Sequence, residues 1–174
     1  PSTPGQCPLI NIRPTFGKYR TYYANPRIKY NNRTLLQATE LMLQADSKEH
    51  AYEFDLTNMT RQLLSNHFLA VFKRYEDAYD CRDRATMTRL QKEMMGIIND
   101  VDRMVKTQGF FLVGKWIKDA RSWGGDSLAE QRYFEQNARN LITTWSDKDQ
   151  LLNDYASRTW AGLANTFYGK RWQM

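Results

Sequence analysis

Apolar side chains that recur every three or four residues constrain the fold of this chain more than any other feature. One stripe lies between residues 51 and 80, and a second lies between residues 86 and 106. They consist of Leu64, Phe68, Val71, Tyr75 and Ala78, followed by Met87, Leu90, Met94, Ile97, Val101 and Met104. This spacing places each set on one face of a helix. Because only a short turn at Asp83-Arg84 separates them, we expect an antiparallel helix pair that crosses at about 20°.

Four further segments have helical patterns. The first covers residues 33–45 and ends at Asp46-Ser47, and another begins near Phe111 and closes at Gly124-Gly125. Asp126 or Ser127 can cap a helix that starts near Leu128. In the last third of the chain, two aromatic-rich patterns over residues 131–145 and 152–167 flank a polar break, so we expect them to pack as a helical hairpin. The sequence thus predicts an all-α, irregular bundle of about six helices without a convincing strand.

Residues 1–32 differ from the rest of the chain. All five prolines lie here, and six basic residues precede the first acidic residue, Glu40, whereas 19 basic and 19 acidic residues follow from there on. Tyrosines interleave with this charge, as in proteins that bind single-stranded nucleic acid. A strap that packs its rings on a helical body explains the same pattern. We favour the strap and divide the chain into an extended arm, 1–32, and a helical body, 33–174.

Catalytic and metal-binding signatures are missing from the sequence. Cys7 and Cys81 have no metal-ligand spacing, and we expect free thiols, although a disulfide is an alternative. His67 falls on an apolar helix face, where a core histidine is expected. Nucleophile-elbow and phosphate-binding glycine motifs do not occur, and no apolar run reaches the roughly 18 residues of a membrane span. We therefore expect no self-contained active site, no metal and no cofactor.

Several linked blocks resemble one known family. They are RPTFGKYRTYY, YEFDLTNMTRQLL, FFLVGKW, DARSW, YFEQNAR, the tryptophan that ends LITTW, NDYASRTWAGL and YGKRW. In this order they resemble the C-terminal helical domain of the α-N-acetylglucosaminidases, glycoside hydrolase family 89. One departure is the break after Trp145, where the family pattern often has Gly-Pro and this chain has Ser146-Asp147-Lys148.

The resemblance implies a hydrolase whose chemistry lies outside this chain. In the family, two glutamates on an upstream (β/α)8 barrel resemble those of a retaining glycosidase. The resemblance implies that the parent enzyme removes terminal α-linked N-acetylglucosamine from glycans such as heparan sulfate. This chain is then expected to be a non-catalytic piece that supports the barrel and helps to wall the sugar pocket. Its location would be extracytoplasmic: secreted or periplasmic in bacteria, lysosomal in animals. Neither nucleic acid nor a membrane is an expected partner.

Four aromatic residues are candidates for contact with the sugar, because aromatic faces suit the C–H face of a pyranose and an indole can donate a hydrogen bond. Trp116, in GKW, is the first choice, with Trp145, Tyr155 and Trp160 as weaker candidates, and core packing is the alternative for each. A second hypothesis from another class is a helical binding module whose basic arm binds a polyanion, either nucleic acid or a sulfated glycan. Salt-sensitive binding through Arg13, Lys18, Arg20, Arg27 and Lys29 would support it.

Overall fold

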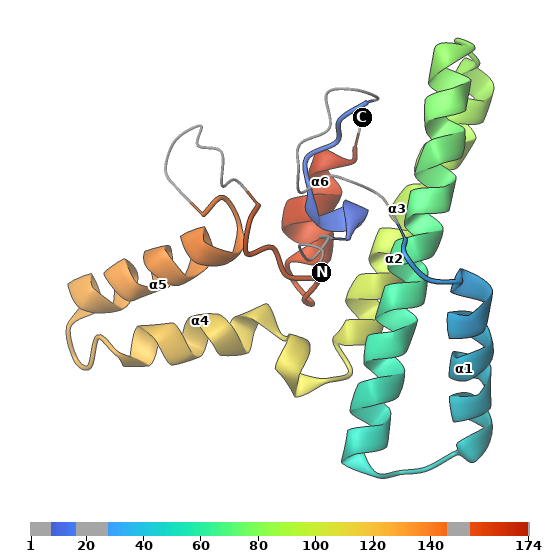
Figure 1. The fold of residues 1–174 in the computed structure, drawn as a ribbon. Coiled ribbons are helices and arrows are strands. Elements are labelled where there is room, and N and C mark those ends of the chain that lie inside the picture. Colours follow the sequence, from blue (N-terminus) through green and yellow to red (C-terminus); the bar gives the residue numbers. More distant parts are fainter. Residues whose placement is uncertain (1–7, 17–27, 146–153, 174) are drawn as a thin grey trace.

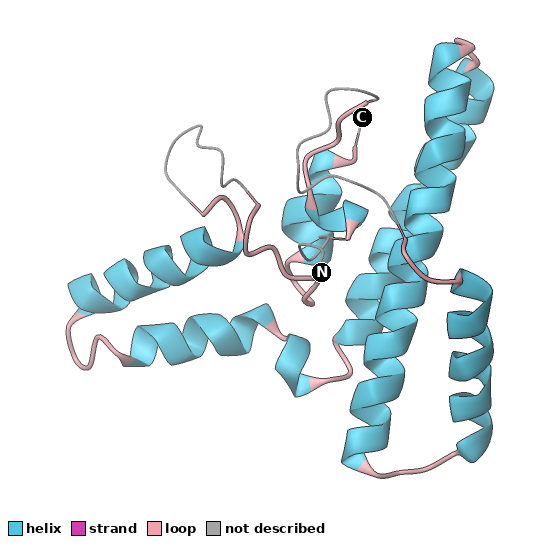
Figure 2. Cartoon of the chain, in the orientation of Figure 1, coloured by secondary structure: helices cyan, strands magenta, loops and turns pink. Residues whose placement is uncertain are grey.

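A computed structural model describes residues 8–16, 28–145 and 154–173, and in these ranges the chain is an all-α fold with six α-helices. Figure 1 shows two pairs of helices, called here the first and the second arm, that meet at a central junction. The name is separate from that of the N-terminal arm, residues 1–32. Figure 2 shows that helices make up nearly all of the regular structure. No helix of the described ranges is long and apolar enough to cross a membrane. The predicted fold class is therefore confirmed.

The first arm is the antiparallel pair of α2 (His50–Asp80) and α3 (Arg84–Val105). The predicted stripes face each other, so that Phe68, Leu90 and Val101 are fully buried. Asp83 turns the chain and caps α3, because its carboxylate accepts a hydrogen bond from the backbone N–H of Thr86 at 3.0 Å. This hydrogen bond from Thr86 also lowers the pKa of Asp83. The sequence pattern predicted both helices to within two residues.

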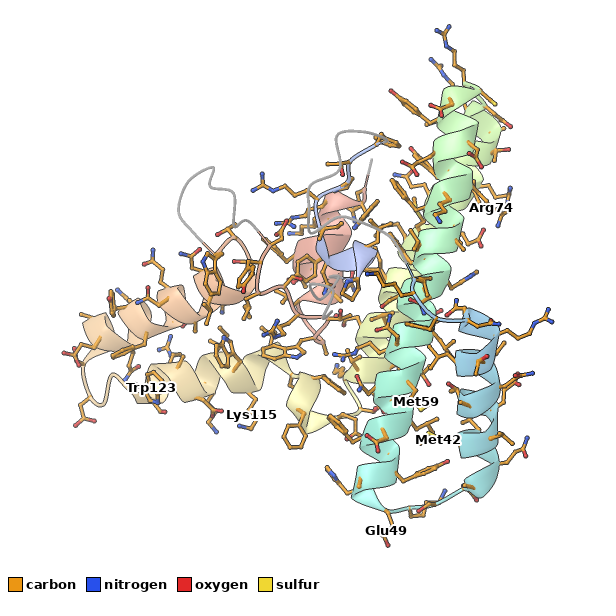
Figure 3. All side chains as sticks on the ribbon, viewed as in Figure 1. Met42, Glu49, Met59, Arg74, Lys115 and Trp123 are labelled. Carbon is orange, nitrogen blue, oxygen red and sulfur yellow. The ribbon has the colours of Figure 1, made fainter. Side chains whose placement is uncertain are left out.

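Helix α1 (Asn32–Ala45) lies along the half of α2 that begins at His50. The Asn31 side chain caps its start, and Asp46, in a left-handed conformation, ends it. Met42 and Met59 lie between the two helices in Figure 3. His67, which we predicted to be a core residue, is instead exposed on α2, with its ring 3.8 Å from the Glu93 carboxylate. The prediction for His67 was therefore wrong, whereas Phe68 beside it, which belongs to the predicted stripe, is buried.

The second arm is a hairpin of α4 (Val113–Ser122) and α5 (Leu128–Ile142), which projects away from α2 and α3 (Figure 1). Ser127, one of the two predicted caps, begins α5 by accepting the N–H of Glu130 at 3.3 Å. Two side chains join the helices. The Trp116 indole N–H donates to the Ala138 carbonyl at 3.0 Å, and Arg121 pairs with Glu135 at 2.6 Å.

The predicted hairpin of residues 131–145 and 152–167 is wrong, because α5 pairs with α4 instead. The described residues from Asp154 to Leu163 are irregular, and only a π-helical turn, η5 (Ala164–Tyr168), and α6 (Gly169–Arg171) follow. Burial here alternates along the chain as in an extended strand, and the buried positions are Ser157, Thr159, Ala161 and Leu163. The Ala161 N–H donates to Phe111 at 2.8 Å rather than within a helix. Gly162, at φ 82°, closes the segment in a left-handed conformation.

The two ends of the chain close the junction between the arms. A short 3-10 turn, η1 (Leu9–Asn11), packs against α2 and η5. The Asn11 amide and the Thr159 hydroxyl exchange two buried hydrogen bonds, of 2.8 and 3.1 Å. Trp172 is fully buried, and its indole N–H donates to the Ile10 carbonyl at 3.0 Å. The core therefore depends on contacts between residues more than 140 positions apart.

Part of the N-terminal segment packs on the helices. Leu9, Ile10 and Ile12 are buried, and the Phe16 ring stacks on Tyr79 with centroids 4.8 Å apart. The division of the chain at residue 32 stays a prediction, because residues 17–27 lie outside the described ranges. Cys81 is an exposed free thiol at the end of α2, and Cys7 also lies outside these ranges.

Candidate aromatic site

Two of the predicted aromatic residues meet where α5 ends. The rings of Trp145 and Tyr155 pack edge to face, with centroids 5.1 Å apart and planes at 72°. Trp145 is half-buried, whereas the Tyr155 side chain is 50% exposed. The pair therefore combines a rigid aromatic contact with rings that solvent can reach, which is the combination that a pyranose-binding surface needs.

The backbone of this pair is held in an unfavourable conformation. Trp145 has φ 65°, and its N–H donates to the Asn140 carbonyl at 2.7 Å, which closes the C-terminus of α5. Glycine ordinarily fills this left-handed position, because a β-carbon there costs about 1–2 kcal/mol. Asp154, which precedes Tyr155, also has φ 65°. Such strain is found at functional sites, and in this chain it also occurs at Asp46 and Arg82, at the ends of α1 and α2.

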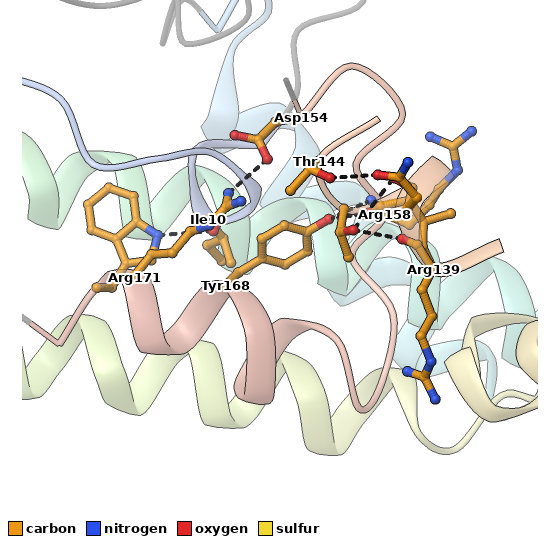
Figure 4. Close-up of polar contacts among 11 residues, drawn as sticks. Ile10, Arg139, Thr144, Asp154, Arg158, Tyr168 and Arg171 are labelled. Carbon is orange, nitrogen blue, oxygen red and sulfur yellow. Dashed lines mark hydrogen bonds and ion pairs between the residues drawn. The ribbon is translucent and has the colours of Figure 1, made fainter. Parts of the chain in front are cut away.

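An ion pair anchors the strained backbone at Asp154. The Asp154 carboxylate is buried and accepts a hydrogen bond from Arg171 Nη1 at 2.8 Å (Figure 4). The Arg171 guanidinium also lies over the Phe167 ring, 4.3 Å from its centroid. Breaking one partner of such a buried pair leaves an uncompensated charge. Arg171, on α6, thereby fixes Asp154, the residue that precedes Tyr155.

A buried tyrosine ties the same segment to α5. The Tyr168 hydroxyl donates to the Ile142 carbonyl at 3.0 Å and accepts the N–H of Arg158 at 3.2 Å (Figure 4). At the end of α5, the Thr144 hydroxyl donates to the Asn140 side chain at 2.6 Å. The two backbone segments that carry Trp145 and Tyr155 are therefore held by a common set of polar contacts.

The other two predicted residues form a separate pair. The rings of Trp116 and Trp160 lie 5.9 Å apart, and both side chains are half-buried. Because the Trp116 indole N–H already bonds Ala138 within the hairpin, it does not serve as a donor to a ligand. This bond fixes the Trp116 ring within the hairpin, whereas the Tyr155 ring is 50% exposed. Sugar contact by any of the four stays a prediction.

The partners of the carboxylates are structural. Arg121 and then Arg139 lower the pKa of Glu135 through their hydrogen bonds. Asp102 accepts the backbone N–H groups of Gly162 and Asn165, at 2.8 and 3.2 Å. Within the described ranges, no group of three or more His, Cys, Asp or Glu side chains could hold a metal ion. Of the basic arm, Lys18, Arg20 and Arg27 lie outside these ranges, so polyanion binding also stays a prediction.

Sequence reasoning missed the residues that hold the aromatic pair. Arg171 and Asp154 attracted no attention, because the pattern predicted a helix across residues 152–167. The spacing in the sequence is helical there, and the alternation of buried and more exposed residues from Ser157 to Leu163 is seen only in the structure. No local signal indicates that Trp145 adopts a positive φ.

The fold and this site define an all-α module that presents an aromatic pair. The family model of the Alpha-N-acetylglucosaminidase (NAGLU) C-terminal domain matches residues 3–174. The chain therefore belongs to this family, which places it among the C-terminal domains of the family 89 glycoside hydrolases.

Solved and curated relatives agree with this assignment. The alpha-N-acetylglucosaminidase of Homo sapiens is 28% identical over 154 residues, which are 86% of this chain and 20% of that protein. A family 89 glycoside hydrolase from Clostridium perfringens, in complex with 2-acetamido-1,2-dideoxynojirmycin, is 29% identical with a TM-score of 0.88. It aligns with 95% of this chain and 20% of its own. A variant from the same organism with two Glu-to-Gln substitutions, in complex with its substrate GlcNAc-alpha-1,4-galactose, is 28% identical with a TM-score of 0.89. It too aligns with 95% of this chain and 20% of its own.

Proposed function

We propose that this chain is the non-catalytic C-terminal domain of a retaining exo-α-N-acetylglucosaminidase, which supports an upstream catalytic barrel and helps to wall the sugar pocket. The observation that carries the proposal is the Trp145–Tyr155 pair, which strained backbone and a buried ion pair hold at the surface. The chain spans about 20% of the length of the relatives it matches, which leaves room for a catalytic domain.

The two-glutamate variant of the bacterial relative, which is described with its substrate, supports a mechanism with two carboxyl groups. Retention needs them about 5–5.5 Å apart, one as nucleophile and one as acid and base. In our proposal both lie upstream of this chain, since the carboxylates of Asp83, Glu135 and Asp154 serve as caps and ion-pair partners. Trp145 and Tyr155 would bind and orient the sugar through their ring faces and exclude water from one side of it.

The proposal is tested in the full-length parent enzyme with an aryl α-N-acetylglucosaminide. Trp145→Ala and Tyr155→Ala should each lower kcat/KM at least about tenfold, because 1.4 kcal/mol of binding is lost with each ring. Trp123→Ala is the matched control, since this 75% exposed ring lies at the far tip of the hairpin (Figure 3). The 174-residue chain alone should leave the substrate intact. Turnover by that chain, or equal effects of Trp145→Ala and Trp123→Ala, would contradict the proposal.

The substrates that we propose are glycans ending in α-linked N-acetylglucosamine, such as heparan sulfate. The substrate in the complex of the bacterial relative, GlcNAc-alpha-1,4-galactose, supports the terminal sugar but not the glycan beyond it. Parallel assays with that disaccharide and with a heparan-derived oligosaccharide would decide between them. Because such glycans are extracytoplasmic, we propose the same location for the parent enzyme, which fractionation of the source cells would test.

A further inference from the structure

A half-buried arginine of α2 has no carboxylate partner within 4.0 Å among residues 8–16, 28–145 and 154–173. The Arg61 guanidinium lies over the Phe111 ring, 4.5 Å from its centroid. Its Nη2 donates to Asn58 Oδ1 at 2.5 Å, and its Nη1 makes a long contact of 3.5 Å with the Thr159 carbonyl. These contacts orient the planar fork but use only part of its five N–H donors.

A second arginine lies beside the first. Arg158, which is exposed, donates through Nη1 to its neighbouring carbonyls of Ala156 and Ser157, at 3.2 and 3.0 Å. Burial first, and then the charge of Arg158, lower the pKa of Arg61. Arg61 reaches the carbonyl of Thr159, the residue after Arg158, so the two cations share one part of the surface. Each raises the electrostatic cost of the other there.

Other arginines of this chain show how such a cost is usually offset. Arg121 and Arg171 have carboxylate partners at 2.6 and 2.8 Å, in Glu135 and Asp154. Among the ion pairs of the described ranges, none includes Arg61 or Arg158 within 4.0 Å. A partly desolvated guanidinium beside a like charge is stabilised best by a bidentate carboxylate.

The surface next to the arginines is aromatic. Phe111, beneath Arg61, stacks on Phe54 with centroids 5.2 Å apart, and Phe54 meets Phe110 edge to face at 5.5 Å. The Phe110 side chain is 68% exposed. Exposed aromatic rings beside arginines are the composition that protein interfaces enrich, whereas small free anions need no such apolar rim.

We infer that Arg61 and Arg158 form a binding site for a carboxylate side chain of the upstream part of the parent enzyme, with the phenylalanines as its apolar rim. The inference rests on the proposed function, because it assigns the arginines to the contact with the catalytic domain. The relatives provide a partner of the required size, since about 80% of their length lies outside the part that this chain matches.

Protease cleavage of the C-terminal domain within the full-length enzyme tests this inference. Arg158→Gln should speed cleavage at least about tenfold, because the partner carboxylate loses one of its two guanidinium partners. Arg158→Lys, which keeps the charge, should restore part of the protection. Arg84→Gln is the matched control, because this exposed arginine begins α3 at the far end of the first arm. In the 174-residue chain alone, Arg158→Gln should leave cleavage unchanged or slow it, since the like-charge repulsion is relieved.

Three results would overturn the inference. In the first, Arg158→Gln and Arg84→Gln have the same cleavage rate in the full-length enzyme. In the second, Arg158→Gln speeds cleavage equally in the enzyme and in the isolated chain, which is the result expected of a purely internal contact. Protection of the isolated chain by a sulfated oligosaccharide, lost in Arg158→Gln alone, would instead assign the site to an acidic glycan. Hydrolysis by the unmodified parent is a separate readout. Its absence would contradict the proposed function, whereas normal hydrolysis with any of these three results would contradict only the arginine site.

Discussion

At the scale of single residues, the conformation of Trp145 separates stability from function. Its φ of 65° suits glycine better than alanine. The free energy of unfolding of Trp145→Gly should therefore be about 1 kcal/mol higher than that of Trp145→Ala. Both variants lose the contact with Tyr155. Chemical denaturation of the two variants measures this difference. Both should lose sugar binding to the same extent, because both lack the ring. If the alanine variant is as stable as the glycine variant, the left-handed conformation at residue 145 is not the one described.

The residue scale is also where the sequence indicated the site only in part. All four aromatic candidates could be named from composition and resemblance, but the bonds that their polar atoms make within the fold could not. Trp116 was the first choice, and its indole N–H proved to bond the Ala138 carbonyl. Whether a ring packs internally depends on the partner of its polar atom. For Trp116 this partner, Ala138, lies 22 residues further along the chain. Local spacing carries no information about them.

At the scale of elements, Glu135 should make the α4–α5 hairpin sensitive to acid. Hydrogen bonds from Arg121 and then Arg139 lower the pKa of Glu135 below its ordinary value of 4.5. A lowered folded-state pKa stabilises the fold above the ordinary value, and this contribution is lost as pH falls from 4.5 through the folded-state pKa. Glu135→Gln should therefore reduce the thermal midpoint at pH 7, and the gap to the unmodified chain should close at acid pH.

The control for this pH effect is Glu130→Gln on the same helix, whose carboxylate is exposed in the first turn of α5. It should leave the shape of the pH profile unchanged. Hydrogen exchange then localises the effect, because the hairpin amides should respond before those of α2 and α3. A uniform response across the chain would contradict a local role for Glu135.

Element prediction succeeded where one pattern dominated. In α2 and α3 the apolar stripe, the Asp83 cap and the lack of proline all favour a helix, and the sequence predicted both. Residues 154–163 show the limit. Their aromatic spacing is helical, but their N–H and carbonyl groups find partners outside the segment, such as Phe111 for the Ala161 N–H. Tertiary hydrogen bonds overrode the local periodicity, and no sequence pattern revealed them.

At the scale of the whole molecule, the fold depends on a closure between its two ends. Trp172 lies in the core between Phe68 and Phe72, with ring centroids 4.8 and 5.2 Å away, and its N–H bonds the Ile10 carbonyl. Residues at opposite ends of the sequence thus complete one hydrophobic core with the long helix pair. The hairpin of α4 and α5 contributes Ile142 to that core, and the partly buried Val113 and Trp116 of α4 pack against it.

Substitutions of Trp172 should therefore act on the entire domain. Trp172→Ala should lower the free energy of unfolding by about 3–5 kcal/mol, because a large buried ring is lost. Trp172→Phe keeps most of the ring but leaves the buried Ile10 carbonyl without its donor, which costs about 1–3 kcal/mol. Denaturant unfolding measures both, with Trp123→Ala, an exposed ring on the hairpin, expected to change stability by only about 0.5 kcal/mol. Equal losses for Trp172→Ala and Trp123→Ala would show that the two chain ends do not close the core.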